Sequence, residues 1–172
     1  TLQNKDRAVG NLLTDNDEPL EITVGANQIR FAFGSVVLVS KLIDGKFPDY
    51  ERVIPAQLVN HMVADRQTLH SAMARVAILT NDKFRGVRIM LEPNTLKIMA
   101  ANAEQEEAQE EIEVKYEGAS LDVGFNVTYL LDVFNNLGGD EVQWSFNDAN
   151  SSALITVPGN DRFKYVVMPM RI

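Results

Sequence analysis

The chain has 172 residues, of which 45% are apolar, and it carries a net charge of −8 and no cysteine. This composition excludes wholesale disorder, disulfides, thiolate catalysis and cysteine-ligated zinc, and its length is sufficient for a buried core. The acidic balance also argues against a protein that grips nucleic acid by neutralising phosphates. No stretch approaches about eighteen consecutive apolar residues and the start has no basic leader, so we expect a soluble, cytoplasmic protein without a membrane partner.

The first third of the sequence is predicted to be the end of one domain. A helical pattern comes first, and three short apolar runs separated by turn residues then predict strands. These segments are KDRAVGNLL (5–13), LEITV (20–24), IRFAF (29–33) and SVVLVSKL (35–42).

A connector follows at 43–55, IDGKFPDYERVIP, where Pro48 and Pro55 disfavour regular structure. We therefore expect residues 1–54 to be the second half of a domain plus this connector, and residues 55–172 to form a complete domain.

Two amphipathic helices are predicted in the second part. The first occupies 65–79 with Asp65 as its N-cap, and the second begins after Asn126 and ends at Gly138 and Gly139. Their apolar positions recur at helical spacing. These positions are Leu69, Ala72, Met73 and Val76 in the first helix and Val127, Leu130, Leu131, Phe134 and Leu137 in the second.

Each helix follows one short strand-like run and precedes three more, so the same unit occurs twice about sixty residues apart. The runs are HMV (61–63), VRIML (87–91), LKIMA (96–100) and EEIEVKY (110–116), then LDV (121–123), EVQWSF (141–146), SALITV (152–157) and FKYVVM (163–168). Strands that follow one another through short turns indicate an antiparallel α+β fold with helices on one face.

No pattern typical of catalysis or of cofactor binding is present. The sequence has no glycine-rich phosphate loop, and His61 and His70 belong to no metal-ligand or nucleophile motif. We therefore expect no enzyme activity, no metal and no cofactor.

The densest charge is AEQEEAQEEIEVKYE (103–117), which has seven glutamates and one lysine. Three interpretations are open: a solvated edge strand protected by repulsion, a metal site, or a surface that steers a basic partner. The metal site is disfavoured because the segment lacks the aspartate-rich loop and glycine turn of hard-cation sites.

The chain ends in YVVMPMRI (165–172), where a proline follows an apolar run. Since proline cannot donate to a strand ladder, we expect the strand to end near Met168 and Pro169 to keep the tail from pairing onward. The segment is either a last strand that packs on its own sheet or half of a binding groove, for which two methionines are adaptable contact residues.

Five stretches in order resemble one family, the bacterial sliding clamp, which is the beta subunit of DNA polymerase III. They are SKLIDGKFPDYERVIP, ARVAILTNDKFRGVR, LKIMAANAEQEEAQEE, GFNVTYLLDV and YVVMPMRI. The resemblance implies a head-to-tail homodimer ring of three-domain protomers, a non-catalytic processivity factor that encircles duplex DNA. It implies partners that dock through short linear motifs: replicative and other DNA polymerases, the clamp loader and repair factors.

The resemblance also implies a hydrophobic groove that captures these motifs, and a Gln-Leu-x-Leu-Phe peptide is its natural test ligand. Asn150 stands where the family often has an apolar residue. The matching positions in this sequence are Pro48, Arg52, Val53, Phe84, Asn126, Tyr129, Asn150, Ser152, Val166, Met168, Pro169, Met170 and Arg171.

A second implied surface is the contact between protomers, an edge strand flanked by an apolar pair and by opposite charges. It matches Ile78, Leu79, Glu104, Glu106, Glu107 and Glu110. The resemblance also implies helices that face DNA in the pore, and Arg66 and Arg75 on the first helix of the complete domain are the candidates for its positive potential. Because the family's first domain and half of its second have no counterpart here, we expect that this chain cannot close a ring. The resemblance also implies that the other wall of the groove comes from that missing half-domain, so we expect peptide binding to be weakened rather than absent. The alternative hypothesis is a stand-alone peptide-interaction module with the same fold.

Overall fold

The computed structural model describes residues 19–43, 45, 49–81 and 83–172, apart from the side chain of Asp161. The chain divides between residues 48 and 49 into two compact units. The helix predicted at 5–13 and the predicted groove residue Pro48 lie outside the described residues.

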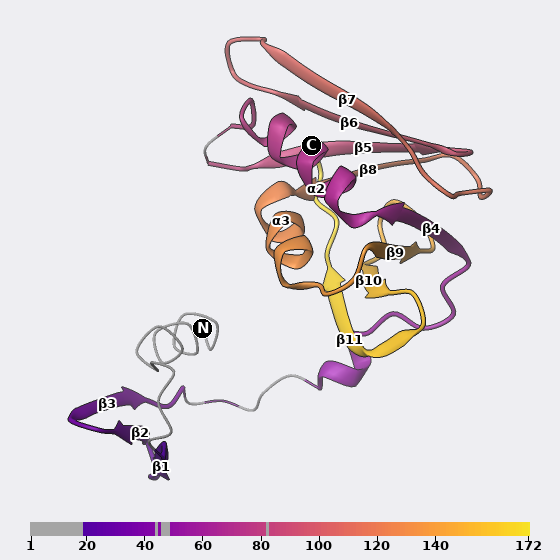
Figure 1. Cartoon of the computed structure of the whole chain (residues 1–172). Helices are drawn as coiled ribbons and strands as arrows, with labels where there is room; N and C mark the ends of the chain where they lie inside the picture. Colours follow the sequence, from indigo (N-terminus) through magenta and orange to yellow (C-terminus); the bar gives the residue numbers. More distant parts are fainter. Residues whose placement is uncertain (1–18, 44, 46–48, 82) are drawn as a thin grey trace. The chain divides into compact units, whose positions relative to one another are not determined.

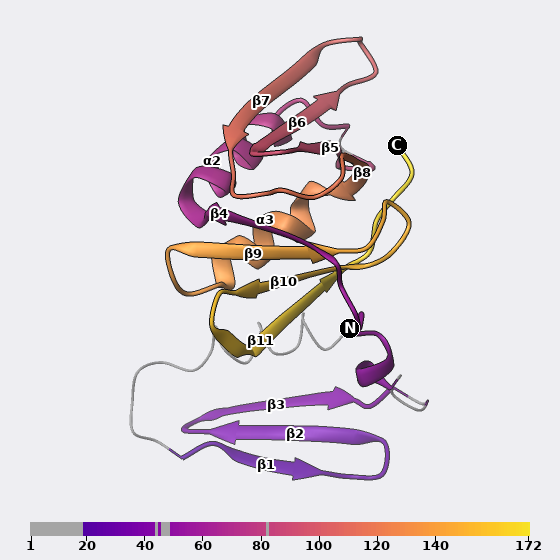
Figure 2. The ribbon, with the colours of Figure 1, turned by 90° about the vertical axis from the view of Figure 1, so that its right-hand side faces the viewer.

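The first unit contains a three-stranded antiparallel sheet. Its strands are β1 (Glu21–Val24), β2 (Gln28–Phe33) and β3 (Val36–Lys41), in the order β1-β2-β3 (Figure 2). Gly25 N donates to Gln28 O at 2.8 Å and closes the first turn. The three strands confirm the sequence prediction.

The second unit contains two four-stranded sheets and two α-helices (Figure 1). In chain order its elements are the 3-10 helix η1 (Tyr50–Arg52), β4 (Asn60–Asp65), α2 (Arg66–Ala77), β5 (Gly86–Glu92), β6 (Thr95–Ala101), β7 (Glu107–Glu113), β8 (Leu121–Asn126), α3 (Val127–Asn136), β9 (Glu141–Phe146), β10 (Ala153–Val157) and β11 (Asn160–Val167).

The predicted duplication is visible in the strand order. One sheet runs β7-β6-β5-β8 and the other runs β11-β10-β9-β4, and all neighbouring pairs are antiparallel. Each strand-helix-three-strand unit therefore places its first strand in the sheet made by the other unit. This exchange ties both halves into one domain and confirms the expected antiparallel α+β fold.

The core lies between the sheets and the helix pair. Helix α2 packs against β4, β6 and β7, α3 packs against β8 and β11, and the two helices contact each other. Trp144 on β9 is 2% exposed, and its ring lies 5.3 Å from Phe125 and 6.4 Å from Phe134. No helix among the described residues is long and apolar enough to cross a membrane.

Both predicted helix caps are confirmed. The Asp65 carboxylate accepts from Thr68 N at 2.7 Å, and the Asn126 amide oxygen accepts from Thr128 N at 2.9 Å. Hydrogen bonds from Thr68 hold the pKa of Asp65 below its ordinary value. These caps matter for the site because each fixes where a sheet strand turns into a helix.

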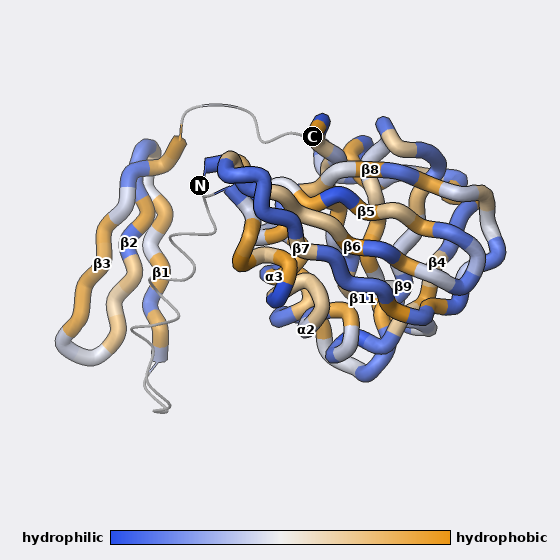
Figure 3. The backbone as a smooth tube through the Cα atoms, turned by 90° about the horizontal axis from the view of Figure 1, so that it is seen from above, coloured by the Kyte–Doolittle hydropathy of each residue, from blue (hydrophilic) through white to orange (hydrophobic). Residues whose placement is uncertain are grey.

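Two strands begin earlier than their sequence patterns indicated. β7 runs from Glu107 to Glu113 rather than over 110–116, and β11 begins at Asn160 rather than at Phe163. Glu107 and Ala108 pair with Ala101 and Ala100 of β6, so backbone pairing extends the strand where apolar alternation is weak. Figure 3 shows the resulting hydrophilic run at the start of β7.

Candidate functional site

The C-terminal tail, residues 168–172, leaves the sheet of β11 and reaches the other sheet at β8. Met170 N donates to Gly124 O at 2.8 Å, which forms an isolated antiparallel bridge. We expected Pro169 to keep the tail from pairing onward, and this expectation is wrong, because Met170, the next residue, pairs with β8. Proline removes only its own N–H, so the next residue can still donate once β11 has ended at Val167.

One pocket lies between the tail and the segment that leads into β5. Phe84 is 61% exposed beside it, and Asn126 Nδ2 donates to Phe84 O at 3.4 Å, which links the pocket to the start of α3. Its volume is about 340 Å³. It is lined by Asn81, Phe84, Gly86, Ala101, Met170, Arg171 and Ile172.

A larger pocket of about 570 Å³ lies on another side of the tail. Arg88 and Asp122 meet there in a two-pronged ion pair of 2.8 and 2.6 Å, and hydrogen bonding from Arg88 lowers the pKa of Asp122. Asn150, Met170 and Arg171 also line it. The structure thus brings Asn150 and the tail to one pocket.

The loop that carries Asn150 is organised by Asp148. The carboxylate of Asp148 accepts from Asn150 N at 2.8 Å and from Ser151 N at 2.9 Å, and its pKa is lowered by these hydrogen bonds, the one from Asn150 first. The predicted residue Ser152 is half-buried just before β10.

The remaining tail-side residues present exposed apolar surface. Met168 is 66% exposed, and Tyr129 on the first turn of α3 is 61% exposed. Val166 is half-buried on β11, opposite Leu154 of β10. An adaptable methionine and an aromatic ring left in solvent are typical of surfaces that bind peptides.

The connector contributes two described residues. Arg52 ends η1, and its Nε lies 3.1 Å from Asp49 Oδ2. Val53 is the C-cap of η1 and is 41% exposed. Neither residue lines the two pockets beside the tail.

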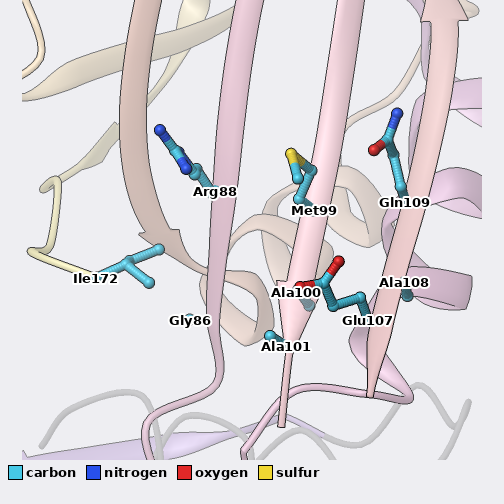
Figure 4. A pocket seen from close by; sticks show the side chains of 9 residues that line it. All are labelled: Gly86, Arg88, Met99, Ala100, Ala101, Glu107, Ala108, Gln109 and Ile172. Atoms are coloured by element: carbon cyan, nitrogen blue, oxygen red, sulfur yellow. The ribbon is translucent and has the colours of Figure 1, made fainter. Parts of the chain in front are cut away.

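Three residues around the tail were missed by the sequence analysis: Ile172, Gly86 and Gly124. Ile172 lines both tail pockets and a third pocket of about 250 Å³ on β5, β6 and β7 (Figure 4). A lone glycine inside the strand pattern LDVGFN was the available signal, because such a glycine often marks close approach of another backbone.

The predicted protomer contact lies at β7, an edge strand of its sheet. Ile78 caps the end of α2 and is 78% exposed, while Leu79 is half-buried. Glu104 and Glu106 lie in the turn before β7, where both backbone N–H groups donate to Asn102 Oδ1. The structure therefore places an exposed isoleucine and the acidic residues within the same domain.

Glu110 is paired with an arginine of α2, whereas the carboxylates of Glu104 and Glu106 accept hydrogen bonds from the Asn102 amide. Arg75 donates to both carboxylate oxygens of Glu110, at 2.7 and 2.9 Å, which lowers the pKa of Glu110 and raises that of Arg75. Arg66 is likewise engaged, since its side chain donates to Gly139 O at 2.7 Å and to Phe134 O at 3.0 Å. Both helical arginines thus have structural partners inside the domain.

The fold, with its exchanged first strands and helix pair, defines a DNA-clamp domain whose exposed surface chemistry suits protein contacts. Family models agree. Residues 51–171 match the C-terminal domain of the DNA polymerase III beta subunit, and residues 7–49 match its central domain. The chain belongs to the DNA polymerase III beta subunit family.

Individual relatives are similar over nearly all of the chain. A beta sliding clamp of Pseudomonas putida is 52% identical and one of Escherichia coli K12 is 47% identical, each over 161 residues and 94% of this chain. The crystal structure of the DNA polymerase III beta subunit from Pseudomonas aeruginosa has a TM-score of 0.85 at 49% identity, covering 95% of this chain and 45% of that one. A further structure of that clamp, bound to griselimycin, has a TM-score of 0.81 at 49% identity and covers 95% of this chain and 44% of that one.

The chain spans 44% of the length of these two curated relatives and corresponds to their C-terminal portion.

Proposed function

We propose that this chain acts in DNA replication as the C-terminal part of a sliding clamp, and that its tail holds partner proteins by short linear motifs. The observation that carries the proposal is the tail itself. Met170 and Arg171 line two pockets of about 340 and 570 Å³; Phe84 also lines the smaller one and Asn150 the larger one. A relative solved with griselimycin supports a ligand-binding surface in this family.

The chemistry of these pockets suits an apolar peptide with a polar backbone. Met168 and Met170 can repack around leucine or phenylalanine side chains, and Arg171 can donate to peptide carbonyls or a carboxylate. Polymerases, the clamp loader and repair factors are the partner classes we propose for this groove. In this proposal the chain is a binding platform for these partners and does not itself catalyse a reaction.

We further propose that duplex DNA is held by encirclement and that β7 is the contact with a second clamp protomer. An acidic protein can hold DNA this way because a closed ring needs no dense phosphate contacts. The exposed Ile78 caps the end of α2, a helix that packs against the edge strand β7, and this supports the contact, since the free side of an edge strand offers backbone groups to another chain. The alternative is a peptide-binding module that never joins a ring.

A peptide titration followed by NMR tests the groove. The chain is labelled with ¹⁵N and ¹³C-methyl methionine, and a Gln-Leu-x-Leu-Phe peptide is added. We expect saturable shifts at Phe84, Tyr129, Asn150 and the tail methionines. Shifts confined to another surface, or none, would refute the groove.

A further inference from the structure

Gly124 is a glycine that the backbone conformation does not require. It lies inside β8, is buried, and its φ is outside the left-handed region. A glycine in a regular strand weakens it unless another group needs the space of the missing side chain. The reason for this glycine is therefore to be found in what approaches it.

What approaches Gly124 is the tail. A Cβ added there would overlap Ile172 Cγ1 and would lie 2.5 Å from Met170 O and 2.6 Å from Ile172 Cδ1. The three nearest atoms all belong to the tail, and one is a backbone oxygen that cannot rotate away. A side chain at Gly124 would therefore push on the tail before it pushed on the sheet.

Gly86 on β5 provides a comparison on the same tail. A Cβ there would lie 3.5 Å from Ile172 Cδ1 and 3.7 Å from Met170 Cε, which are ordinary contact distances. Figure 4 shows Ile172 and Gly86 on the same side of the β5 pocket, away from Glu107 and Ala108. The tail thus tolerates a methyl group at Gly86 but not at Gly124.

We propose that Gly124 is a positioning residue for the peptide-binding groove: its bare backbone seats the tail through the Met170–Gly124 bridge and leaves the space that Ile172 fills. With the tail seated, Met170 and Arg171 are held in one register in the pockets that Phe84 and Asn150 line. The inference rests on the proposed function, because it assigns Gly124 a role in that same groove.

The test compares three glycine-to-alanine variants. Gly124→Ala introduces the clash, Gly86→Ala adds the same methyl in open contact, and Gly138→Ala adds it where nothing lies within 4 Å. For each variant, hydrogen exchange of the Met170 amide reports whether the bridge to Gly124 O persists. Affinity for a Gln-Leu-x-Leu-Phe peptide and thermal unfolding are measured on the same samples.

We expect Gly124→Ala alone to speed exchange of the Met170 amide. We also expect it to weaken peptide binding relative to Gly138→Ala, which lies outside both tail pockets. Gly86 lines the smaller tail pocket, so Gly86→Ala is a control for the exchange measurement only. If the seated tail falls to a tenth of the population, the apparent Kd rises about tenfold. Ile172→Ala, which adds no atoms, covers the case in which Gly124→Ala does not fold, and it should also speed exchange and weaken binding.

Unchanged Met170 exchange in Gly124→Ala, or faster exchange with unchanged peptide affinity, would overturn the inference. Equal losses in Gly138→Ala would overturn it as well. If the unsubstituted chain does not bind the peptide, the proposed function is refuted, and the positioning role with it. Exchange of the Met170 amide would still show whether Gly124→Ala breaks the bridge between the tail and β8.

Discussion

Arg75 and Glu110 form a two-pronged ion pair that joins α2 to the edge strand β7, with donor–acceptor distances of 2.7 and 2.9 Å. The pair combines a residue expected to face DNA with one expected at the protomer contact. Each charge is thus partly satisfied inside the domain. Any role of these two residues in DNA or protomer contacts must compete with this internal pair.

The ion pair predicts an acid-dependent stability difference. The folded-state pKa of Glu110 lies below its ordinary value of 4.5. The pair therefore stabilises the fold fully above about pH 4.5, and this stabilisation is lost as the pH falls through the lowered folded-state pKa. Glu110→Gln should therefore unfold more easily than the unsubstituted chain at pH 7, and the difference should shrink below pH 4.5. Urea unfolding across pH measures this.

The control for that experiment is Glu107→Gln, which neutralises an exposed carboxylate on the same strand. It should show no comparable pH-dependent difference. A Glu110→Gln difference that persisted undiminished in acid would contradict the account.

Arg66 is predicted to stabilise the domain by capping α3. Its guanidinium donates to Phe134 O in the last turns of α3 and to Gly139 O beyond it, where a cation also meets the negative end of the helix dipole. Arg66→Ala should lower the free energy of unfolding by about 1–2 kcal/mol, whereas Arg162→Ala, an exposed site on β11, should change it little. If Arg66→Ala leaves the free energy of unfolding unchanged, the capping role is contradicted, and a DNA-facing role explains the presence of Arg66 better.

Much of the fold could be predicted because its determinants are local. Asp65 and Asn126 sit at cap positions before apolar patterns with helical spacing, and both act as caps. The strand boundaries of β7 could not be placed as well. Glu107 is in that strand because β6 offers it backbone partners, and sequence periodicity does not record cross-strand pairing.

Phe84 is predicted to be an energetic anchor of peptide binding. It is exposed and lines the smaller tail pocket, so its removal should cost affinity without disturbing the core. Phe84→Ala should weaken peptide binding at least about tenfold and change the free energy of unfolding by less than about 0.5 kcal/mol. Phe163→Ala, equally an exposed aromatic site but on β11, is the control. Equal affinity in both variants would exclude Phe84 from the site.

Ile78 is predicted to contribute to the protomer contact. In a hybrid clamp that carries this chain in place of the matching part of the Pseudomonas putida relative, Ile78→Asp should raise the dimer dissociation constant at least about tenfold. The dissociation constant should rise because Ile78→Asp would bury a charge against an apolar surface of the second protomer. Sedimentation analysis measures it, with Val59→Asp as a control at another exposed site. An unchanged dimer dissociation constant would indicate that the protomers meet at another surface.

The candidate site was only partly predictable from the sequence. Phe84, Asn150, Met170 and Arg171 could be named in advance from a family resemblance, and the structure brings them to the two tail pockets. Ile172 and Gly124 were missed because their roles depend on a bridge between segments far apart in the chain. Only the folded tail shows that a strand glycine makes room for it.

The most direct measurement is the affinity of a labelled Gln-Leu-x-Leu-Phe peptide for this chain and for a version that ends at Val166. We predict saturable binding to the full chain and loss of that binding in the shortened one, because the pockets beside Met170 and Arg171 disappear with the tail. Equal binding to both, or binding to neither, would contradict the claim that the tail forms the recognition surface of this chain.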